Sequence, residues 1–298
     1  MKILGIETSF DDTCISIIDD KKGILINKII NNNKIYNKYN GIIPEIVSNY
    51  HIKKIDKLLK NILLKLNINI KKISLISYTC GPGLISSLSI GASYAKSLSY
   101  LLKIPSIPIN HLEGHLLSPM INNNNIKKKI KFPFIGLIIS GANTQLIKAT
   151  NFDNYKIIGQ TLDNAIGETY DKIAKLLNIN YPGAKKLVYY SNKGKNNIYN
   201  FPKPLIKKDN LNFSFSGLIT YINNLIKKIK NINIQDKYNI AKEFENSIIK
   251  ILQNKILLSI KKYNIYNIFI SGGVSINNNI IKNIIKLKIK NKKIFFYS

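Results

Sequence analysis

Residues 2–19, KILGIETSFDDTCISIID, decide the fold of the first half of this chain. The ranges 2–8 and 14–19 are rich in Ile and other apolar residues, and they predict two buried strands. Residues 9–13 between them are mostly polar or acidic, as is typical of a turn. The stretch therefore predicts two neighbouring strands whose connection presents hydroxyl and carboxylate groups.

A second stretch with the same spacing opens the other half of the chain, at residues 134–149, FIGLIISGANTQLIKA. The shared positions are Gly5, Ser9 and Thr13 in the first stretch and Gly136, Ser140 and Thr144 in the second. Two halves that each begin with a hairpin and a small, polar turn predict a duplicated α/β domain. A repeat this short is also compatible with coincidence.

Strand and helix signals continue after each hairpin. In the first half we expect a strand over 24–30, a helix over 44–66, a strand over 73–79 and a helix ending near Leu102. In the second half we expect strands near 147 and 157, helices over 166–177, 216–230 and 237–262, and strands over 265–270 and 293–297. The expected domains are 1–121 and 132–298, joined by an Asn/Lys-rich linker over 122–131.

Composition places the chain among ordinary globular proteins, with 298 residues, 45% of them hydrophobic and 20% charged. Lys or Asn interrupts each apolar run before it reaches the length of a membrane span. The first residues form a strand pattern rather than that of a signal peptide. Only Cys14 and Cys80 are present, which argues against a disulfide framework or a thiolate zinc site. We therefore expect a cytoplasmic protein with no membrane segment.

The chain is strongly basic, with 45 Lys+Arg against 16 Asp+Glu and a net charge of +29. Such a surface favours phosphate-rich partners such as RNA. However, the chain has no Arg and no Trp and is dominated by Ile, Asn and Lys, so codon drift in an AT-rich genome explains the charge equally well. The charge permits a tRNA partner without establishing one.

The sharpest local feature is His111-Leu112-Glu113-Gly114-His115, which holds two of the three histidines. On a helix this spacing puts both imidazoles on one face, with Cβ atoms roughly 5–6 Å apart, so that they can share one metal ion. Imidazole suits iron or zinc, and a third ligand, often a carboxylate, is then needed. Glu113 should point away from the pair. The alternative is a pair of histidines on a polar face.

Three loops are candidates for binding a phosphate or nucleoside, because small residues let a backbone approach a ligand and successive N–H groups form an anion site. They are Glu7–Thr13, Ser140–Thr144 and Gly272–Asn277, and each follows a predicted strand. Asp171 is a fourth candidate. Each is a weak signal by itself, since ordinary turns use the same residues and a helix carboxylate is often only solvated.

Taken in order along the chain, these pieces resemble the tRNA N6-adenosine threonylcarbamoyltransferase family. The motifs that carry the resemblance are Ile6-Glu7-Thr8-Ser9 with Asp11, Gly81-Pro82-Gly83-Leu84, His111 to His115, Ser140-Gly141, Gly167-Glu168 with Asp171-Lys172, Phe213-Ser214-Phe215-Ser216-Gly217 and Gly272-Gly273-Val274-Ser275. The resemblance implies the fold of the actin and sugar-kinase group. In that fold, two related actin-like (ribonuclease H-like) α/β domains surround a nucleotide cleft.

The resemblance also implies an acyltransferase reaction. The threonylcarbamoyl group of threonylcarbamoyl-AMP moves to N6 of the adenosine just 3′ of the anticodon, in tRNAs that read codons beginning with A, and AMP leaves. One divalent metal ion, iron or zinc, serves as a Lewis acid. Family members work with an enzyme that makes the adenylate, and either with a paralogous subunit and a small ATPase or as homodimers.

Site residues follow from the resemblance position by position. His111 and His115 match the metal ligands, and Asp11 belongs to the first active-site loop, where we expect it to orient or deprotonate the attacking group. The expected contacts with the adenylate are Ile138, Ile139, Ser140, Gly141 and Ala142 along its length, and Asp171, Ala184 and Asn277 at its ribose and base.

The chain departs from the family pattern at several of these positions. Ala142 and Asn143 stand where the family usually has Gly and His, and Ala184 replaces another glycine. The family's third metal ligand is an aspartate just beyond the last strand, and this sequence ends at Ser298, so we expect that ligand and the closing segment to be absent. Metal affinity should then fall, unless a carboxylate of the first loop substitutes.

Two other functions stay open from the sequence. The missing ligand motivates a scaffold subunit of the same tRNA-modification complex with weakened catalysis. Phosphate-binding loops alone are also compatible with an ATPase or kinase of the same fold group. A metallopeptidase is disfavoured, because Leu112 follows His111 where the H-E-x-x-H motif requires Glu.

Overall fold

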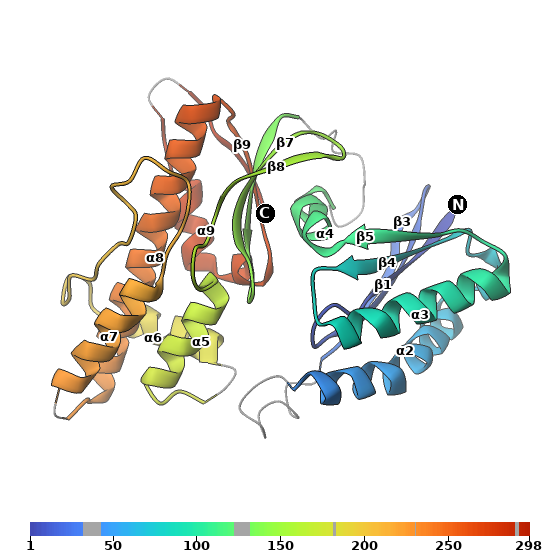
Figure 1. Ribbon diagram of the computed structural model, residues 1–298, viewed down its shortest axis with the longest axis horizontal. Helices are drawn as coiled ribbons and strands as arrows, with labels where there is room; N and C mark the ends of the chain where they lie inside the picture. The colour runs from blue at the N-terminus through green and yellow to red at the C-terminus, as the bar shows by residue number, and fades with distance from the viewer. Residues whose placement is uncertain (32–42, 122–131, 181–182, 230, 290–291) are drawn as a thin grey trace. The chain divides into compact units, whose positions relative to one another are not determined.

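The computed structural model describes residues 1–31, 43–121, 132–180, 183–229, 231–289 and 292–298 (Figure 1). The chain forms two compact units, Met1–Lys129 and Ile130–Ser298, and each has its own hydrophobic core. The predicted linker over 122–131 lies outside the described residues.

The first unit is built on a five-stranded sheet in the order β3-β2-β1-β4-β5. Its strands are β1 (Lys2–Glu7), β2 (Thr13–Asp19), β3 (Gly23–Ile30), β4 (Leu75–Gly81) and β5 (Ser106–Asn110). Strands β1, β2 and β3 are antiparallel neighbours, whereas β4 runs parallel to β1 and β5 parallel to β4. The hairpin predicted from residues 2–19 is confirmed, with Gly5 opposite Ser16.

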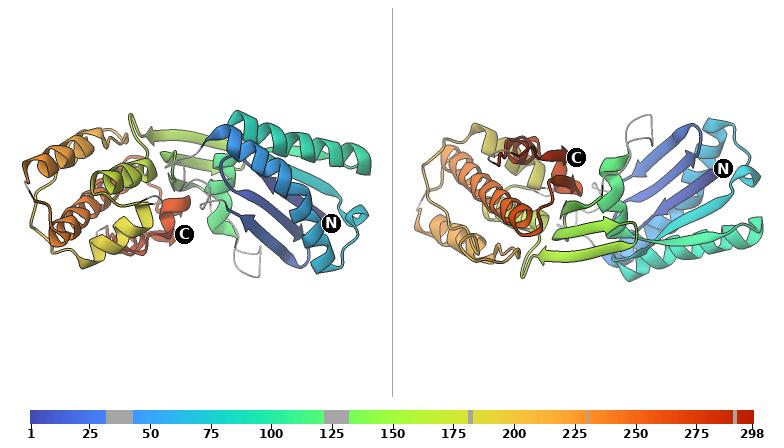
Figure 2. Two further views of the ribbon diagram at one scale, coloured as in Figure 1. Left: turned by 90° about the horizontal axis from the view of Figure 1, so that it is seen from below. Right: turned by 90° about the horizontal axis from the view of Figure 1, so that it is seen from above.

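Helices α2 (Pro44–Leu66) and α3 (Ile85–Leu102) cover one face of this sheet (Figure 2). Helix α2 begins with Pro44 in its first turn, where a missing N–H breaks no helical bond, and it ends as Asn67 turns left-handed. Its buried side chains join the apolar residues of the sheet in one core. The helix predicted over 44–66 is confirmed. The 3₁₀ turns η1 (Ile70–Lys72) and η2 (Ser118–Met120) and the short helix α4 (His111–Leu117) complete the described elements of this unit.

The second unit repeats the topology of the first, with the sheet order β10-β9-β6-β7-β8. Its strands are β6 (Phe134–Ile139), β7 (Thr144–Asn151), β8 (Asn154–Gln160), β9 (Asn267–Ser271) and β10 (Phe295–Tyr297). In both sheets the central strand has an antiparallel hairpin on one side and parallel strands on the other. The common order confirms the predicted duplication and the α/β class.

The helices of the second unit are α5 (Ile166–Leu176), α6 (Gly183–Lys193), α7 (Ser216–Lys228), α8 (Ile234–Tyr263) and α9 (Asn278–Ile285), with a 3₁₀ turn η3 (Gly273–Ile276). Helix α8 spans 30 residues and opens with a capping box between Asn233 and Asp236. It carries Phe244, Ile248 and Leu252 through the core. The sequence predicted α5, α7 and α8 but not α6.

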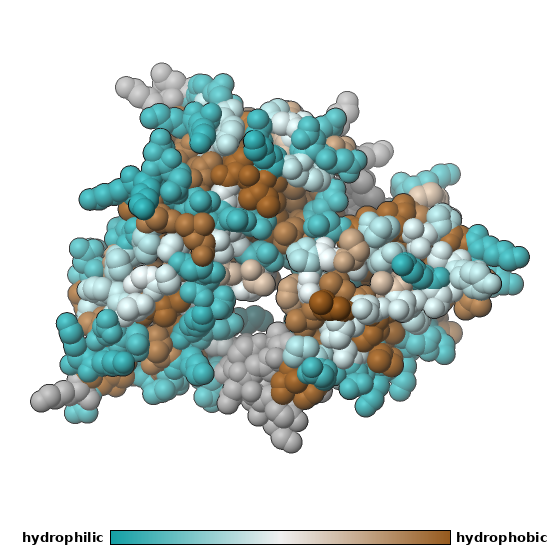
Figure 3. All heavy atoms as spheres, in the orientation of Figure 1, coloured by the Kyte–Doolittle hydropathy of each residue, from teal (hydrophilic) through white to brown (hydrophobic). Residues whose placement is uncertain are grey.

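On the side shown in Figure 3, hydrophilic residues spread over both units, with hydrophobic residues scattered among them. Among the helices that the structure describes, none has the length and apolar content that a membrane span requires. Cys14 and Cys80 are both free, as expected.

Candidate functional site

The loop after β1 is held against the first turn of α3. The Thr8 hydroxyl donates to the Ser87 carbonyl at 2.9 Å, and the Leu84 N–H donates to the Ser9 carbonyl at 2.8 Å. A Cβ on Gly83 would lie 2.5 Å from that same Ser9 oxygen, so only glycine allows this approach. The motif around Gly83 therefore supports the first loop.

His51 of α2 contacts both ends of the same loop. One ring nitrogen lies 2.8 Å from the Phe10 carbonyl and the other 2.8 Å from the Thr13 hydroxyl. The side chain of His51 is fully buried. Asp11 and Asp12 lie between these two anchors.

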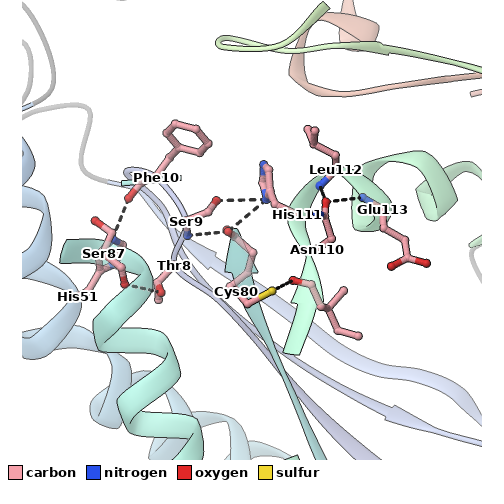
Figure 4. A network of polar contacts seen from close by, with 12 residues as sticks. Thr8, Ser9, Phe10, His51, Cys80, Ser87, Asn110, His111, Leu112 and Glu113 are labelled. Carbon is pink, nitrogen blue, oxygen red and sulfur yellow. Dashed lines mark hydrogen bonds and ion pairs between the residues drawn. The ribbon is translucent and has the colours of Figure 1, made fainter. Parts of the chain in front are cut away.

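The predicted metal ligands lie on α4, directly after β5. The Asn110 side chain caps this helix by accepting the N–H groups of Leu112 and Glu113 (Figure 4). The rings of His111 and His115 are 4.5 Å apart between centroids, in a T-shaped arrangement. Glu113 points away from His111, as expected (Figure 4).

The first loop reaches His111 through two polar side chains. Ser9 Oγ lies 3.2 Å from His111 Nδ1 (Figure 4). Glu7 Oε1 lies 3.5 Å from the same nitrogen. Glu7 also accepts the Ser9 N–H at 2.7 Å. With Nδ1 engaged on this side, a neutral His111 presents its Nε2 lone pair away from Glu7, which is the arrangement that metal-bound histidines adopt.

Electrostatics favour an ionised carboxylate at Glu7 and a neutral imidazole at His115. Burial acts to raise the pKa of Glu7, but hydrogen bonds from His111 and Ser9 outweigh it and hold that pKa below its usual value. Burial, followed by the neighbouring His111, lowers the pKa of His115. Metal binding requires neutral imidazoles, so the lowered pKa of His115 suits a metal ligand, and the pair fits a divalent ion in donor type.

Over the described parts of the chain, no group of three or more His, Cys, Asp or Glu side chains is arranged to hold a metal ion. The structure brings His111 and His115 together and places Glu7 beside the first of them, but it does not assemble a full ligand set. Glu7 was predicted only as part of the loop Glu7–Thr13, and not as a partner of His111. Glu7 is identified by the contact of its carboxylate with the ring of His111. The two residues are far apart in the sequence, so no local pattern predicts this contact.

Asp12, beside the predicted Asp11 in the first loop, is a further candidate that the sequence did not identify. Asp12 is partly buried, and burial together with the charges of Asp11 and Glu7 raises its pKa from 3.8 to about 6. Its Oδ1 atom is buried without a hydrogen-bond partner in the described structure. Asp12 therefore joins the predicted Asp11 as a candidate for accepting a proton near neutral pH.

In the second unit, the loop after β6 packs on the start of α5. The N–H groups of Gly167 and Glu168 donate to the carbonyls of Ser140 and Gly141, both at 3.1 Å. A Cβ on Gly167 would lie 2.6 Å from the Gly141 Cα, which explains the glycine of that motif. The Ser140 hydroxyl in turn accepts the Asn143 N–H at 3.0 Å. This packing fixes the course of the predicted adenylate loop.

The predicted contacts in β6 are limited by burial. The side chains of Ile138 and Ile139 are fully buried in the strand, so only their backbone is placed to meet a ligand. Gly141 and Ala142 are exposed, and a Cβ on Gly141 would meet open space.

Asp171 and Ala184 are brought together by the packing of α5 on α6. The Asp171 carboxylate interacts with the backbone N–H groups of Ala184 and Gly183. Its Oδ1 atom is buried and has no hydrogen-bond partner among the described residues. Burial raises the pKa of Asp171 in spite of those two contacts. A buried acceptor without a donor is what a ligand hydroxyl would satisfy.

Asn277 lies after β9, beyond a glycine with unusual backbone geometry. Gly272 has φ +94°, and a Cβ there would lie 2.4 Å from the Ile139 carbonyl. The Asn277 side chain caps α9 by accepting the N–H groups of Asn279 at 2.9 Å and Ile280 at 3.4 Å. Its Nδ2 donates to Glu245 at 2.7 Å, so Asn277 belongs to a polar network inside this unit.

Residues 23–297 match the protein family described as TsaD: tRNA N6-adenosine threonylcarbamoyltransferase. The chain is 51% identical, over 297 residues, to a protein of that name from Wigglesworthia glossinidia brevipalpis, covering 99% of this chain and 86% of the relative. A second relative with that name, from Buchnera aphidicola subsp. Baizongia pistaciae, is 43% identical with the same shares covered.

Among solved structures, HypF of T. kodakarensis superposes with a TM-score of 0.64 at 14% identity, covering 99% of this chain and 45% of that chain. The activator of 2-hydroxyisocaproyl-CoA dehydratase from Clostridium difficile gives a TM-score of 0.52 at 16% identity, with 99% and 87% covered. At this identity the likeness shows a shared fold.

Proposed function

This chain belongs to the tRNA N6-adenosine threonylcarbamoyltransferase family, which makes it an acyltransferase of threonylcarbamoyladenosine synthesis, and on that premise we propose how its residues divide the reaction. Relatives over nearly the whole chain carry the same name. The kinase and scaffold alternatives are therefore not favoured.

The proposed reaction joins two substrates. The N6 amine of the tRNA adenosine attacks the carbamoyl carbon of threonylcarbamoyl-AMP, the new N–C bond forms, and the C–O bond to the phosphate breaks. AMP leaves as the anion and the amine loses one proton. Catalysis requires a bound adenylate, a stabilised carbonyl oxygen and an acceptor for that proton.

The second unit is proposed to bind the adenylate. The loop Ser140–Ala142 presents exposed backbone, and the unpartnered Oδ1 of Asp171 would accept a hydrogen bond from a ribose hydroxyl. Ala184 adjoins Asp171, and Asn277 stands at the start of α9. Ile138 and Ile139 would contribute through their backbone.

The first unit is proposed to hold the metal and the proton acceptor. His111 and His115 would bind the divalent ion, iron or zinc, and Glu7 would orient the first of them. When bound, such an ion polarises a carbonyl as a Lewis acid. Asp11 is proposed to orient or deprotonate the attacking amine, with Asp12 beside it.

The observation that carries this assignment is the His111–His115 pair with Glu7 and Ser9 at Nδ1 of the first ring. We also propose a cytoplasmic location and, as partners, either a paralogous subunit with a small ATPase or a second copy of this chain.

The test is rescue of a bacterial strain depleted of its own transferase, with threonylcarbamoyladenosine quantified in digested tRNA by mass spectrometry. The intact chain should restore the nucleoside, and His111→Ala with His115→Ala should not. Glu113→Ala, on the same helix but pointing away, is the matched control and should restore it. A double variant that restores the nucleoside as well as the intact chain would remove the histidines from the mechanism.

A further inference from the structure

Glu245 is a buried carboxylate at the centre of a polar network in the second unit. It lies in α8 with 1% of its surface exposed. One oxygen, Oε1, accepts from Asn277 Nδ2 at 2.7 Å and from the Tyr170 hydroxyl at 3.4 Å. The other, Oε2, accepts from the Ser191 hydroxyl at 2.6 Å and from Asn279 Nδ2 at 2.9 Å.

Within the part of the chain that the structure describes, the network contains no compensating cation. Among the ion pairs between described residues, none involves Glu245. Removing a carboxylate from water is costly, and here only neutral hydrogen-bond donors offset that cost. An apolar side chain at this place in α8 would fill the core without that cost. The carboxylate therefore points to a role in holding its donors in position.

The donors come from the elements that carry the proposed nucleotide contacts. Tyr170 precedes Asp171 in α5. Ser191 lies in α6, whose first turn contains Ala184. Asn277 and Asn279 form the start of α9. Glu245 thus ties together the three helices on which the adenosine part of the substrate is proposed to rest.

The contact with Asn277 also fixes the direction of its carboxamide. Its Oδ1 accepts the N–H groups of Asn279 and Ile280, and its Nδ2 donates to Glu245. A reversed amide would set an oxygen against the carboxylate and an NH₂ group against two N–H donors. The two ends of the side chain therefore allow one orientation only.

We propose that Glu245 is a positioning residue for the adenylate site: it sets the geometry of Asn277, α5 and α6, and so the affinity for the AMP portion of the substrate, without touching the substrate itself. This inference rests on the proposed function. Loss of the carboxylate should act on substrate binding rather than on the chemical step, because the ribose and the phosphate separate the reacting carbonyl from the adenine along the substrate.

The experiment compares Glu245→Gln with wild type. Gln keeps the size of the side chain and one acceptor oxygen, but it sets an NH₂ group against two of the donors. We expect the Kd for AMP, measured by calorimetry, and the KM for threonylcarbamoyl-AMP each to rise about tenfold, with kcat within about twofold. Glu243→Gln is the matched control, because Glu243 is also a buried carboxylate of α8 but bonds to Asn197 and Asn246. It should leave both constants unchanged.

Tyr170→Phe and Ser191→Ala provide a second route if Glu245→Gln does not fold, since each removes one donor and retains the carboxylate. Each should raise the KM about threefold with kcat unchanged. Wild-type Kd and KM in folded Glu245→Gln, or in both donor variants, would overturn the positioning role while the transferase assignment stands. If wild type formed no threonylcarbamoyladenosine, the proposed function would fail, and the Kd for AMP would still test the network.

Discussion

His51 Nε2 lies 2.8 Å from the carbonyl oxygen of Phe10, which can only accept a hydrogen bond, so Nε2 carries the proton. Nδ1 of the neutral ring then accepts from the Thr13 hydroxyl, also at 2.8 Å. One imidazole in a single tautomer thus joins both ends of the loop that contains Asp11. His51 was not among the predicted site residues.

Because His51 is buried as a neutral ring, the stability of the first unit should depend on pH. Burial lowers the pKa of His51 in the folded protein, whereas the unfolded chain titrates near pH 6.5. Above that pH both states are neutral and the stabilisation is complete. As pH falls below 6.5, the unfolded chain takes up the proton first. The free energy of unfolding therefore decreases until the pH falls below the pKa of His51 in the folded protein.

The measurement is urea unfolding of wild type and His51→Gln between pH 5 and pH 8. Gln provides one donor and one acceptor but does not titrate. Wild type should be the more stable at pH 8, and its advantage should shrink toward pH 5. A constant difference in the free energy of unfolding across this range would contradict the assignment.

Asp12 should have the opposite dependence. Its pKa is about 6 in the folded protein against 3.8 for the ordinary side chain, so folding favours the protonated form. The stabilisation is complete below the unfolded value and is lost as pH rises through 6. We expect Asp12→Asn to raise the free energy of unfolding by about 1 kcal/mol at pH 8, after allowance for solvent screening, and to leave it nearly unchanged at pH 3.5.

Chemical denaturation of the metal-free protein at the two pH values tests this. Asp153→Asn, at an exposed turn position, is the control and should shift stability by less than about 0.5 kcal/mol at either pH. An equal gain from both variants at pH 8 would show that net charge, rather than the setting of Asp12, is responsible.

Gly272 should be irreplaceable at its position. Its φ of +94° is unfavourable for other residues, and a Cβ would lie 2.4 Å from the Ile139 carbonyl. We expect Gly272→Ala to lower the free energy of unfolding by about 1–3 kcal/mol. Gly273→Ala is the adjacent control, since its Cβ would meet open space, and it should have little effect. Equal melting temperatures for the two variants would refute this reading of the motif.

Local signals in the sequence were sufficient for much of the fold. Helix α2 matches the predicted range because Pro44 and the apolar spacing are visible in the chain itself. The repeat around Ser9 and Ser140 correctly indicated two related sheets, because each hairpin is a short-range structure. Helix α6 was missed, since its sequence, GAKKLVYYSNK, has only three buried positions and its burial depends on packing against α8.

The candidate site was predictable only in part, because local signals in the sequence do not show which distant residues come into contact. Two histidines four residues apart on a helix are neighbours by helix geometry alone, as His111 and His115 are. The partners of such residues come from distant segments: Glu7 beside His111, and Glu245 beside Asn277. Only the packing of the strands and helices brings these pairs together, so no spacing in the sequence identifies them.

The contact between Glu7 and His111 leads to a prediction about metal affinity. A carboxylate at Nδ1 fixes the ring and raises the basicity of the other nitrogen, and removing such a partner typically weakens metal binding about 10–100-fold. Glu7→Gln keeps the shape of the side chain but loses the negative charge, which hydrogen bonds from His111 and Ser9 stabilise in the folded protein. We therefore expect zinc, added to the metal-free protein in competition with a chelator, to bind at least about tenfold more weakly to this variant. Glu113→Gln changes a carboxylate on the helix of His111 that points away from this histidine, and the variant should bind zinc like wild type.

If both variants bound zinc with wild-type affinity, Glu7 would have no part in the metal site. If both weakened it equally, the charge of the surroundings rather than the Nδ1 contact would set the affinity.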